Sequence, residues 1–174
     1  MTGNVFLGLG SNIGDRLKFL SGAIQKISEN ESIKIVGISS VYESIPLGPV
    51  NQNDYLNMVL KLETSLDVYG LFEFVKKIEK EIGRNKTVRW GAREIDIDIL
   101  FFGSLVVRGE KIIIPHPEII HRDFVLLPLK EIDSDFIHPQ NNRSISELTE
   151  ELQNSYVYNV FGNESLKLEG VNLV

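Results

Sequence analysis

RWGAREIDIDIL, residues 89–100, carries two carboxylates inside an otherwise apolar segment that is typical of a β-strand. Residues i and i+2 of a strand point to the same face, so Asp96 and Asp98 share one face. The other face belongs to Ile95, Ile97 and Ile99. Two like charges on a half-buried surface repel each other and lose hydration, so a cation should compensate them. A divalent metal ion is the natural candidate, and the neighbouring arginines indicate that phosphate accompanies it.

The polar loop before this strand is basic. Residues 83–94 contain four cations within ten positions: Arg84, Lys86, Arg89 and Arg93. Such a loop beside paired carboxylates favours phosphate as the ligand over a merely solvated surface. Glycines at positions 83 and 91 would let the loop bend, so we expect a lid that closes on substrate.

The composition is that of one folded domain without nucleic-acid or membrane partners. A chain of 174 residues suits a single compact domain spanning 1–174. The net charge of -6 disfavours non-specific binding to nucleic acid, which needs a basic protein. The chain has no cysteine, no leader-like start and no run of about 18 apolar residues. We therefore expect a cytoplasmic protein, with a monomer as the default state.

Hydrophobic periodicity predicts the element order β-α-β-β-α-β. Asp15 is expected to cap the first helix. The predicted strands cover residues 4–9, 32–42, 55–64 and the segment around the aspartate pair, and the predicted helices cover 17–27 and 68–82. This order is typical of the ferredoxin-like α+β sandwich, with an antiparallel sheet and helices on one face.

Additional C-terminal strands and helices should follow this unit. The pattern indicates short strands at 105–107 and 111–114, a Pro-His-Pro turn at 115–117, and helices at 125–132 and 145–152. The tail from 155 to 174 has no clear period, and no pattern defines a structure beyond about residue 160. We expect either an appended strand or a partly ordered end.

Three further features leave alternatives open. The segment GLGSNIG at 8–14 lacks the dinucleotide and Walker signatures, so a close backbone approach to a ligand and a plain tight turn fit it equally. His116, between two prolines, fits a phosphate ligand better than a structural turn residue, whereas His121 and His138 fit surface or structural roles. Tyr55, Phe124 and Trp90 could be core residues, or could enclose a planar heterocycle close to the amide of Asn57.

Taken together, these residues resemble the 6-hydroxymethyl-7,8-dihydropterin pyrophosphokinase family of folate biosynthesis. The resemblance runs in the family's order over about residues 4–135, through Gly8-Leu9-Gly10-Ser11-Asn12, Pro46-Leu47-Gly48-Pro49, Asp54-Tyr55-Leu56-Asn57, Ile78-Glu79, Gly83-Arg84, residues 89–100, Pro115-His116-Pro117 and Arg122-Asp123-Phe124-Val125-Leu126. The segment Arg-Trp-Gly-x-Arg-x-x-Asp-Ile-Asp-Ile is its specific signature. Two departures are Lys86, where relatives often carry arginine, and Ala92, where they often carry proline.

The resemblance implies that ATP donates its β,γ-pyrophosphate to the primary alcohol of the pterin and leaves as AMP. It implies two Mg²⁺ ions on Asp96 and Asp98, with Arg84 and Arg93 as catalytic cations closest to the migrating charge. The implied ATP-binding residues are Glu79, Lys86, Arg89, Arg93, Ile99, His116 and Arg122. The implied pterin-binding residues are Ser44, Ile45, Leu47, Tyr55, Asn57, Trp90 and Phe124, with Tyr55 and Phe124 stacking on the ring. No residue is an evident general base.

Two other readings compete with the pyrophosphokinase. A catalytically silent ferredoxin-like module that binds RNA or another ligand would need neither the aspartate pair nor the clustered arginines. An ordinary γ-phosphoryl kinase would release ADP instead of AMP. The partners expected for the favoured reading are only ATP and the hydroxymethyl dihydropterin.

Overall fold

The computed structural model describes residues 2–47, 52–83, 92–166, 168 and 171. Eight strands and four α-helices follow one another as β1 (Thr2–Ser11), α1 (Arg16–Ser28), β2 (Ile33–Ile38), β3 (Val41–Ser44), β4 (Tyr55–Thr64), α2 (Val68–Ile82), β5 (Asp96–Phe102), β6 (Val107–Arg108), β7 (Ile113–Ile114), α3 (Asp123–Asp133), α4 (Ile145–Glu150) and β8 (Val157–Phe161) within the described residues. Single 3₁₀ turns cover Ile119–His121 and Asn163–Ser165.

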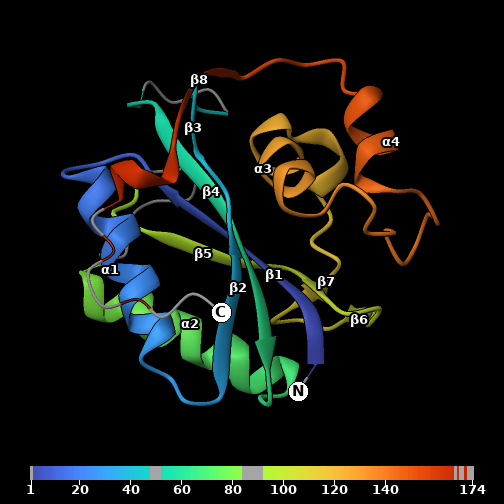
Figure 1. The fold of residues 1–174 in the computed structure, drawn as a ribbon, viewed down its shortest axis with the longest axis horizontal. Coiled ribbons are helices and arrows are strands. Elements are labelled where there is room, and N and C mark those ends of the chain that lie inside the picture. The colour runs from blue at the N-terminus through green and yellow to red at the C-terminus, as the bar shows by residue number, and fades with distance from the viewer. Residues whose placement is uncertain (1, 48–51, 84–91, 167, 169–170, 172–174) are drawn as a thin grey trace.

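The main sheet is antiparallel, as predicted. Its strand order is β5-β1-β4-β3-β8, and β2 pairs with β4 beside β3. The central strand β1 therefore has β4 on one side and β5 on the other. This order places β5, the aspartate strand with Asp96 and Asp98, next to the glycines Gly8 and Gly10 of β1. β6 and β7 form a separate two-stranded ribbon. Figure 1 shows the long strands crossing the middle of the molecule.

The predicted boundaries of the first two helices are confirmed, to within one residue for α1, and their caps explain them. The carboxylate of Asp15 accepts a hydrogen bond from Lys18 N, 3.1 Å away, and begins α1. The carboxylate of Asp67 accepts from Gly70 N and begins α2. Gly83 ends α2 with a φ of 109°, a left-handed conformation that glycine adopts without strain.

The prediction of one continuous strand over 32–42 is wrong. The structure breaks this segment at Ser39 and Ser40 into β2 and β3. The buried Ser39 hydroxyl accepts a hydrogen bond from Val59 N at 2.9 Å, and Ser39 N donates to Val59 O. Ser40 N donates to the carboxylate of Glu131. Side-chain oxygens thus replace the regular ladder here, and β4 pairs with two short strands instead of one long strand.

Helices cover both faces of the sheet. The prediction of helices on one face holds for α1 and α2, and the C-terminal helices form a second layer on the other side (Figure 1). The first core cluster includes Leu7, Leu20, Ile24, Leu71, Val75 and Ile97, and the second includes Phe6, Leu100, Phe101, Leu126 and Leu129. β1 alternates between them, so its residues of one parity face α1 and those of the other face α3.

The C-terminal elements largely follow the sequence pattern. The predicted short strands shrink to the two-residue β6 and β7, and the predicted helices appear as α3 and α4. His138 is a structural residue, because it is buried and its ring packs edge-on against Phe101 at 5.3 Å between centroids. The tail forms β8. No described helix is long and apolar enough to cross a membrane.

Candidate active site

A cavity of about 380 Å³ opens on the α3 side of the sheet. Its walls come from β1, β4, β5, the segment after β3, the turn at 116 and the start of α3. The structure brings eleven of the predicted site residues to this cavity: Ser44, Ile45, Leu47, Tyr55, Asn57, Arg93, Asp96, Asp98, His116, Arg122 and Phe124. The sequence motifs from five separate segments therefore converge on one site.

The aspartate strand is oriented as predicted. Asp96 and Asp98 line the cavity, whereas Ile95, Ile97 and Ile99 lie in the core cluster beneath α1 and α2. This placement confirms that the two carboxylates share the face that is open to a ligand. Ile99 itself does not line the cavity.

Two glycines form the floor between the carboxylates and the amide. Gly8 and Gly10 lie within β1, so the segment is a strand at this point and not a turn. Gly10 pairs across the sheet with Asp96 on one side and with Asn57 on the other, and Gly8 pairs with Asp98. The row Asp96-Gly10-Asn57 spans three strands, roughly 10 Å, with no side chain in its middle. A flat ligand can therefore approach the backbone of β1 closely.

Filling this floor should block the site. A Cβ at position 10 would lie 3.3 Å from Oδ1 of Asn57, so the branched side chain of a Gly10→Val variant would project into the cavity. We expect substrate KM to rise about tenfold or more, while the strand backbone accepts a β-branched residue. Steady-state kinetics and thermal melting would check this. Gly3→Val, where nothing lies within 4 Å of the added Cβ, is the control on the same strand. An unchanged KM in the Gly10 variant would contradict the assignment of the floor.

Each predicted metal carboxylate faces a cation. Arg93 Nη1 is hydrogen-bonded to Asp96 Oδ2. Lys76 Nζ, from α2, lies 3.8 Å from Asp98 Oδ1 and donates to Ile97 O at 2.9 Å. Lys76 was not predicted from the sequence, because only the packing of α2 against β5 brings it there. Arg93 therefore compensates the charge of Asp96, whereas Lys76 is shared between Asp98 and the nearer carboxylate of Glu79.

Glu79 lies behind this strand. It is buried in α2, and its Oε1 accepts hydrogen bonds from Ile97 N at 2.7 Å and from Lys76 Nζ at 2.8 Å. Like Ile99, Glu79 does not line the cavity. Its carboxylate fixes the backbone of the residue between the two aspartates.

The amide of Asn57 is held at the opposite end. Its Nδ2 donates to Ser44 Oγ at 2.9 Å, and both side chains are almost fully buried. Tyr55 and Phe124 line the cavity nearby. This half of the site therefore offers an oriented amide and two aromatic rings to a planar polar heterocycle.

The remaining hydrogen-bond donors of the cavity come from the turn after β7 and from the start of α3. Burial lowers the pKa of His116, although the nearby Asp98 opposes the shift. Glu118 N donates to His116 Nδ1 at 3.3 Å, which assigns the proton of the neutral ring to Nε2. The buried Nε of Arg122 has no hydrogen-bond partner among the described residues. Both groups are donors suited to an anion near the N-terminus of α3.

A buried asparagine joins the segments around the cavity. Asn12, at the end of β1, is 0% exposed. Its Nδ2 donates to Gln52 Oε1 at 3.0 Å and to Asn53 O at 3.2 Å, and its Oδ1 accepts from Arg93 N at 2.7 Å. In the sequence, Asn12 stands out only as part of the motif at residues 8–14. Its one signal was a polar amide directly after an apolar strand, which does not reveal three partners from distant segments.

Removing this amide should lower both the stability of the fold and the activity. Asn12→Ala would leave Arg93 N and the 52–53 segment without their partner, each a cost of about 1–3 kcal/mol when buried. Because Arg93 and Gln52 line the cavity, we expect kcat to fall about tenfold to a hundredfold. Asn30→Ala, which removes one cap-like bond to Ser32 N away from the cavity, is the control. Equal kinetics in the two variants would contradict this role.

Four predicted site residues, Arg84, Lys86, Arg89 and Trp90, lie outside the described residues, as does Gly91. The predicted lid, which depends on this segment, therefore stays a prediction.

Comparison with known proteins identifies the family. A family model for 7,8-dihydro-6-hydroxymethylpterin-pyrophosphokinase (HPPK) matches residues 6–134. A 2-amino-4-hydroxy-6-hydroxymethyldihydropteridine pyrophosphokinase of Aquifex aeolicus is 46% identical over 147 residues, 84% of this chain and 91% of the relative. The enzyme of the same name from Bacillus subtilis is 41% identical over 132 residues, 76% of this chain and 79% of the relative.

Solved structures show the same fold. The crystal structure of wild-type Plasmodium falciparum HPPK-DHPS with pteroate has a TM-score of 0.70 at 17% identity, over 87% of this chain and 44% of that longer chain. At this identity the likeness concerns the fold alone. With the family model covering most of the chain and relatives above 40% identity, the chain belongs to the 7,8-dihydro-6-hydroxymethylpterin-pyrophosphokinase family.

Proposed function

We propose that the chain transfers pyrophosphate from ATP to the hydroxymethyl group of 6-hydroxymethyl-7,8-dihydropterin, giving the pterin diphosphate and AMP. The observation that carries this proposal is the row across the cavity floor, with Asp96 at one end, Gly10 in the middle and Asn57 at the other end. ATP bound at the carboxylates and the pterin bound at the amide of Asn57 would meet above Gly10, which has no side chain.

In the acceptor half, Tyr55 and Phe124 would stack on the two faces of the pterin. Asn57 would pair with its amide edge, because Ser44 already fixes the orientation of that side chain. Backbone groups of Ser44, Ile45 and Leu47 would complete the pocket, with Trp90 from the basic loop. Aromatic faces and one oriented amide are the groups that select a flat, hydrogen-bonding heterocycle.

In the donor half, Asp96 and Asp98 would hold Mg²⁺ together with the phosphates. The described residues contain no group of three or more His, Cys, Asp or Glu that could hold a metal ion alone. Two carboxylates at a cavity wall nevertheless fit Mg²⁺, which is commonly bound by one or two carboxylates plus substrate oxygens. When bound, two such ions would neutralise the oligophosphate and align it for displacement.

Arginine, lysine and histidine donors would stabilise the migrating group. Arg93, His116 and Arg122 line the cavity, and Arg84, Lys86 and Arg89 would join them from the loop. Arg84 and Arg93 would act closest to the transferred pyrophosphate, where charge develops in the transition state. We assign no general base, because positioning and charge neutralisation are sufficient for the alcohol to attack.

Glu79 and Ile99 would serve the nucleotide side indirectly. Glu79 fixes Ile97 N between the two carboxylates, and Ile99 packs in the core beneath them. Both would hold the wall against which ATP binds.

The ferredoxin-like arrangement is our proposal for the N-terminal unit. The order β5-β1-β4 followed by β2 and β3, with every neighbouring pair antiparallel, supports it. We further propose that residues 1–174 form one domain that acts as a monomer without nucleic acid.

The products decide between the competing readings. Incubation with Mg-ATP and the hydroxymethyl pterin, followed by chromatographic separation of the nucleotides, should give AMP and the pterin diphosphate in equal amounts. ADP as the sole nucleotide product would support a γ-phosphoryl kinase, and no turnover would support a silent binding module. Either result would overturn the proposal.

A further inference from the structure

The C-terminal segment lies against the acceptor half of the cavity. β8 forms the edge of the main sheet and pairs antiparallel with β3, with Ser44 opposite Val157 (Figure 1). This segment lies beyond residues 6–134, the span that the family model matches. Neither the sequence motifs nor the family match therefore suggests a role for the residues of this C-terminal segment.

A buried carboxylate ties this segment to the start of α3. Asp123 is 3% exposed and lies between Arg122 and Phe124. Its Oδ1 accepts a hydrogen bond from Phe124 N at 2.7 Å. Its Oδ2 accepts from Tyr156 N at 2.6 Å and from Val157 N at 2.8 Å. One carboxylate thus joins the backbone of a proposed stacking residue to the chain just before β8.

Tyr156 contacts the acceptor half from two directions. Its carbonyl oxygen accepts a hydrogen bond from Ile45 N at 3.1 Å. Its ring meets the ring of Phe124 edge-on, with 6.2 Å between centroids and 74° between planes. Such edge-to-face contacts fix ring orientation as well as burying apolar area. Tyr156 therefore touches both Phe124 and the segment that begins at Ser44.

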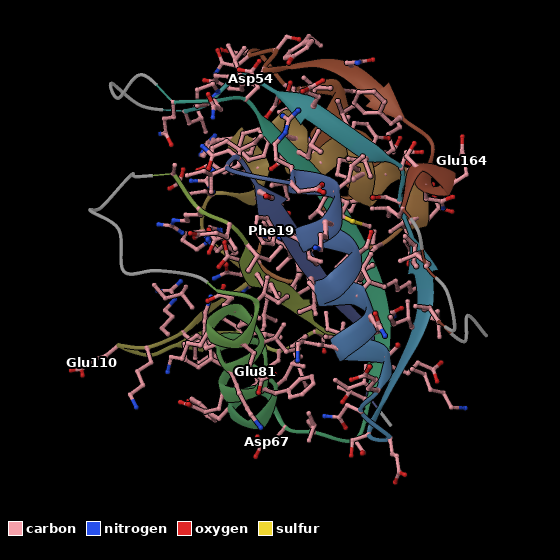
Figure 2. The ribbon with its side chains drawn as sticks, turned by 90° about the vertical axis from the view of Figure 1, so that its left-hand side faces the viewer. Phe19, Asp54, Asp67, Glu81, Glu110 and Glu164 are labelled. Carbon is pink, nitrogen blue, oxygen red and sulfur yellow. The ribbon has the colours of Figure 1, made fainter. Side chains whose placement is uncertain are left out.

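A second tyrosine acts on the other stacking residue. Tyr158 Oη donates to Asp54 Oδ2 at 2.7 Å, directly before Tyr55 in the chain. This hydrogen bond raises the pKa of Tyr158 to about 12, so the hydroxyl remains a donor at neutral pH. Figure 2 shows Asp54 at the end of the molecule where the C-terminal strand runs. Residues of this one strand region therefore support both proposed stacking positions.

We infer that Tyr156 is a positioning residue for the pterin subsite, holding the ring of Phe124 and the segment after β3 in their binding arrangement. The inference rests on the proposed function, because it takes Phe124 as a stacking residue. Without the Tyr156 ring, Phe124 would sample more orientations, and the pterin would have to order it on binding. The proposed ATP contacts at Arg93 and Asp96 lie at the other end of the cavity floor from Asn57, whereas Arg122 lies over the ring of Phe124. ATP binding should therefore change much less than pterin binding.

The test is pterin binding by Tyr156→Ala, Tyr156→Phe and Phe161→Ala. Calorimetry with hydroxymethyl pterin, in the presence of Mg²⁺ and a non-hydrolysable ATP analogue, gives the Kd without turnover. Tyr156→Ala should weaken pterin binding about tenfold and leave the Kd of the analogue within about twofold. Tyr156→Phe keeps the ring contact and should bind like the wild type. Phe161→Ala loosens the far end of β8 and should also bind like the wild type.

Three outcomes would overturn the inference: unchanged pterin affinity in Tyr156→Ala, an equal loss in Phe161→Ala, or parallel losses of pterin affinity, analogue affinity and melting temperature. The last two would make β8 a structural edge strand only. AMP formation by the wild type tests the proposed function separately. A wild type that binds the pterin but forms no AMP would overturn the function and leave the affinities to decide the role of Tyr156.

Discussion

Asp98→Asn should abolish metal-dependent turnover, with kcat lowered about a thousandfold or more and the fold retained. The side chain of Asp98 is 41% exposed and lines the cavity opposite Gly8, so an isosteric amide disturbs no core packing. The amide keeps the shape but loses the charge that would hold the cation. Its single ion-pair partner among the described residues, Lys76 at 3.8 Å, also binds Glu79 and Ile97 O and would stay in place.

The measurement is AMP formation at saturating pterin and ATP over a range of Mg²⁺ concentrations, with thermal melting alongside. Asp135→Asn makes the same substitution at an exposed position after α3 and should leave kcat unchanged. If the Asp98 variant keeps more than about a tenth of the wild-type rate, the assignment of Asp98 as a metal ligand is wrong.

Local periodicity was enough to predict the strands that carry Asp96, Asp98 and Asn57, and the helix α2. Alternation alone placed Asp96 and Asp98 on one face, and the structure agrees because a strand has no other way to arrange i and i+2. The bounds of β4 and α2 match the predicted 55–64 and 68–82, since apolar spacing and the Asp67 cap act within a few residues. Signals of this kind lie within one segment of the chain.

Features that depend on distant partners could not be predicted. The break in the strand at Ser39 arises from hydrogen bonds with Val59, which lies in another strand. Gly10 becomes the cavity floor only through its register with Asp96 and Asn57. Asn12 acts through three partners from two other segments. In each case the feature depends on which distant segments pair with each other, and the pattern of residues within one segment carries no information about that pairing.

The sequence predicted α3 and α4 but not the face of the sheet that they cover, and it left the tail open between an appended strand and a partly ordered end. The helical pattern of α3 indicates which of its faces is apolar, but not which face of the sheet it covers. The tail shows no period because β8 is an exposed edge strand, with Tyr158 and Val160 in contact with solvent. Pairing with β3, rather than burial, defines this strand.

Arg93→Ala should change catalysis and metal affinity in opposite directions. The backbone of Arg93 is fixed by Asn12, and its guanidinium forms an ion pair with Oδ2 of Asp96, a proposed metal-binding oxygen. The guanidinium and a divalent cation compete for this oxygen. Removing the guanidinium should therefore tighten the binding of Mn²⁺, used as a probe for Mg²⁺, to the free protein. It should also lower kcat about a hundredfold to a thousandfold, because the transition state loses a charge-stabilising donor.

Paramagnetic titration with Mn²⁺ and steady-state kinetics measure the two effects. The KM for ATP should change much less than kcat, since the contact tightens in the transition state. Arg108→Ala removes the same charge from an exposed position on β6 and should affect neither quantity. Equal losses in kcat and in ATP affinity would make Arg93 a simple binding residue. Weaker Mn²⁺ binding in Arg93→Ala would show that the ion pair orients Asp96 for the metal instead of competing with it.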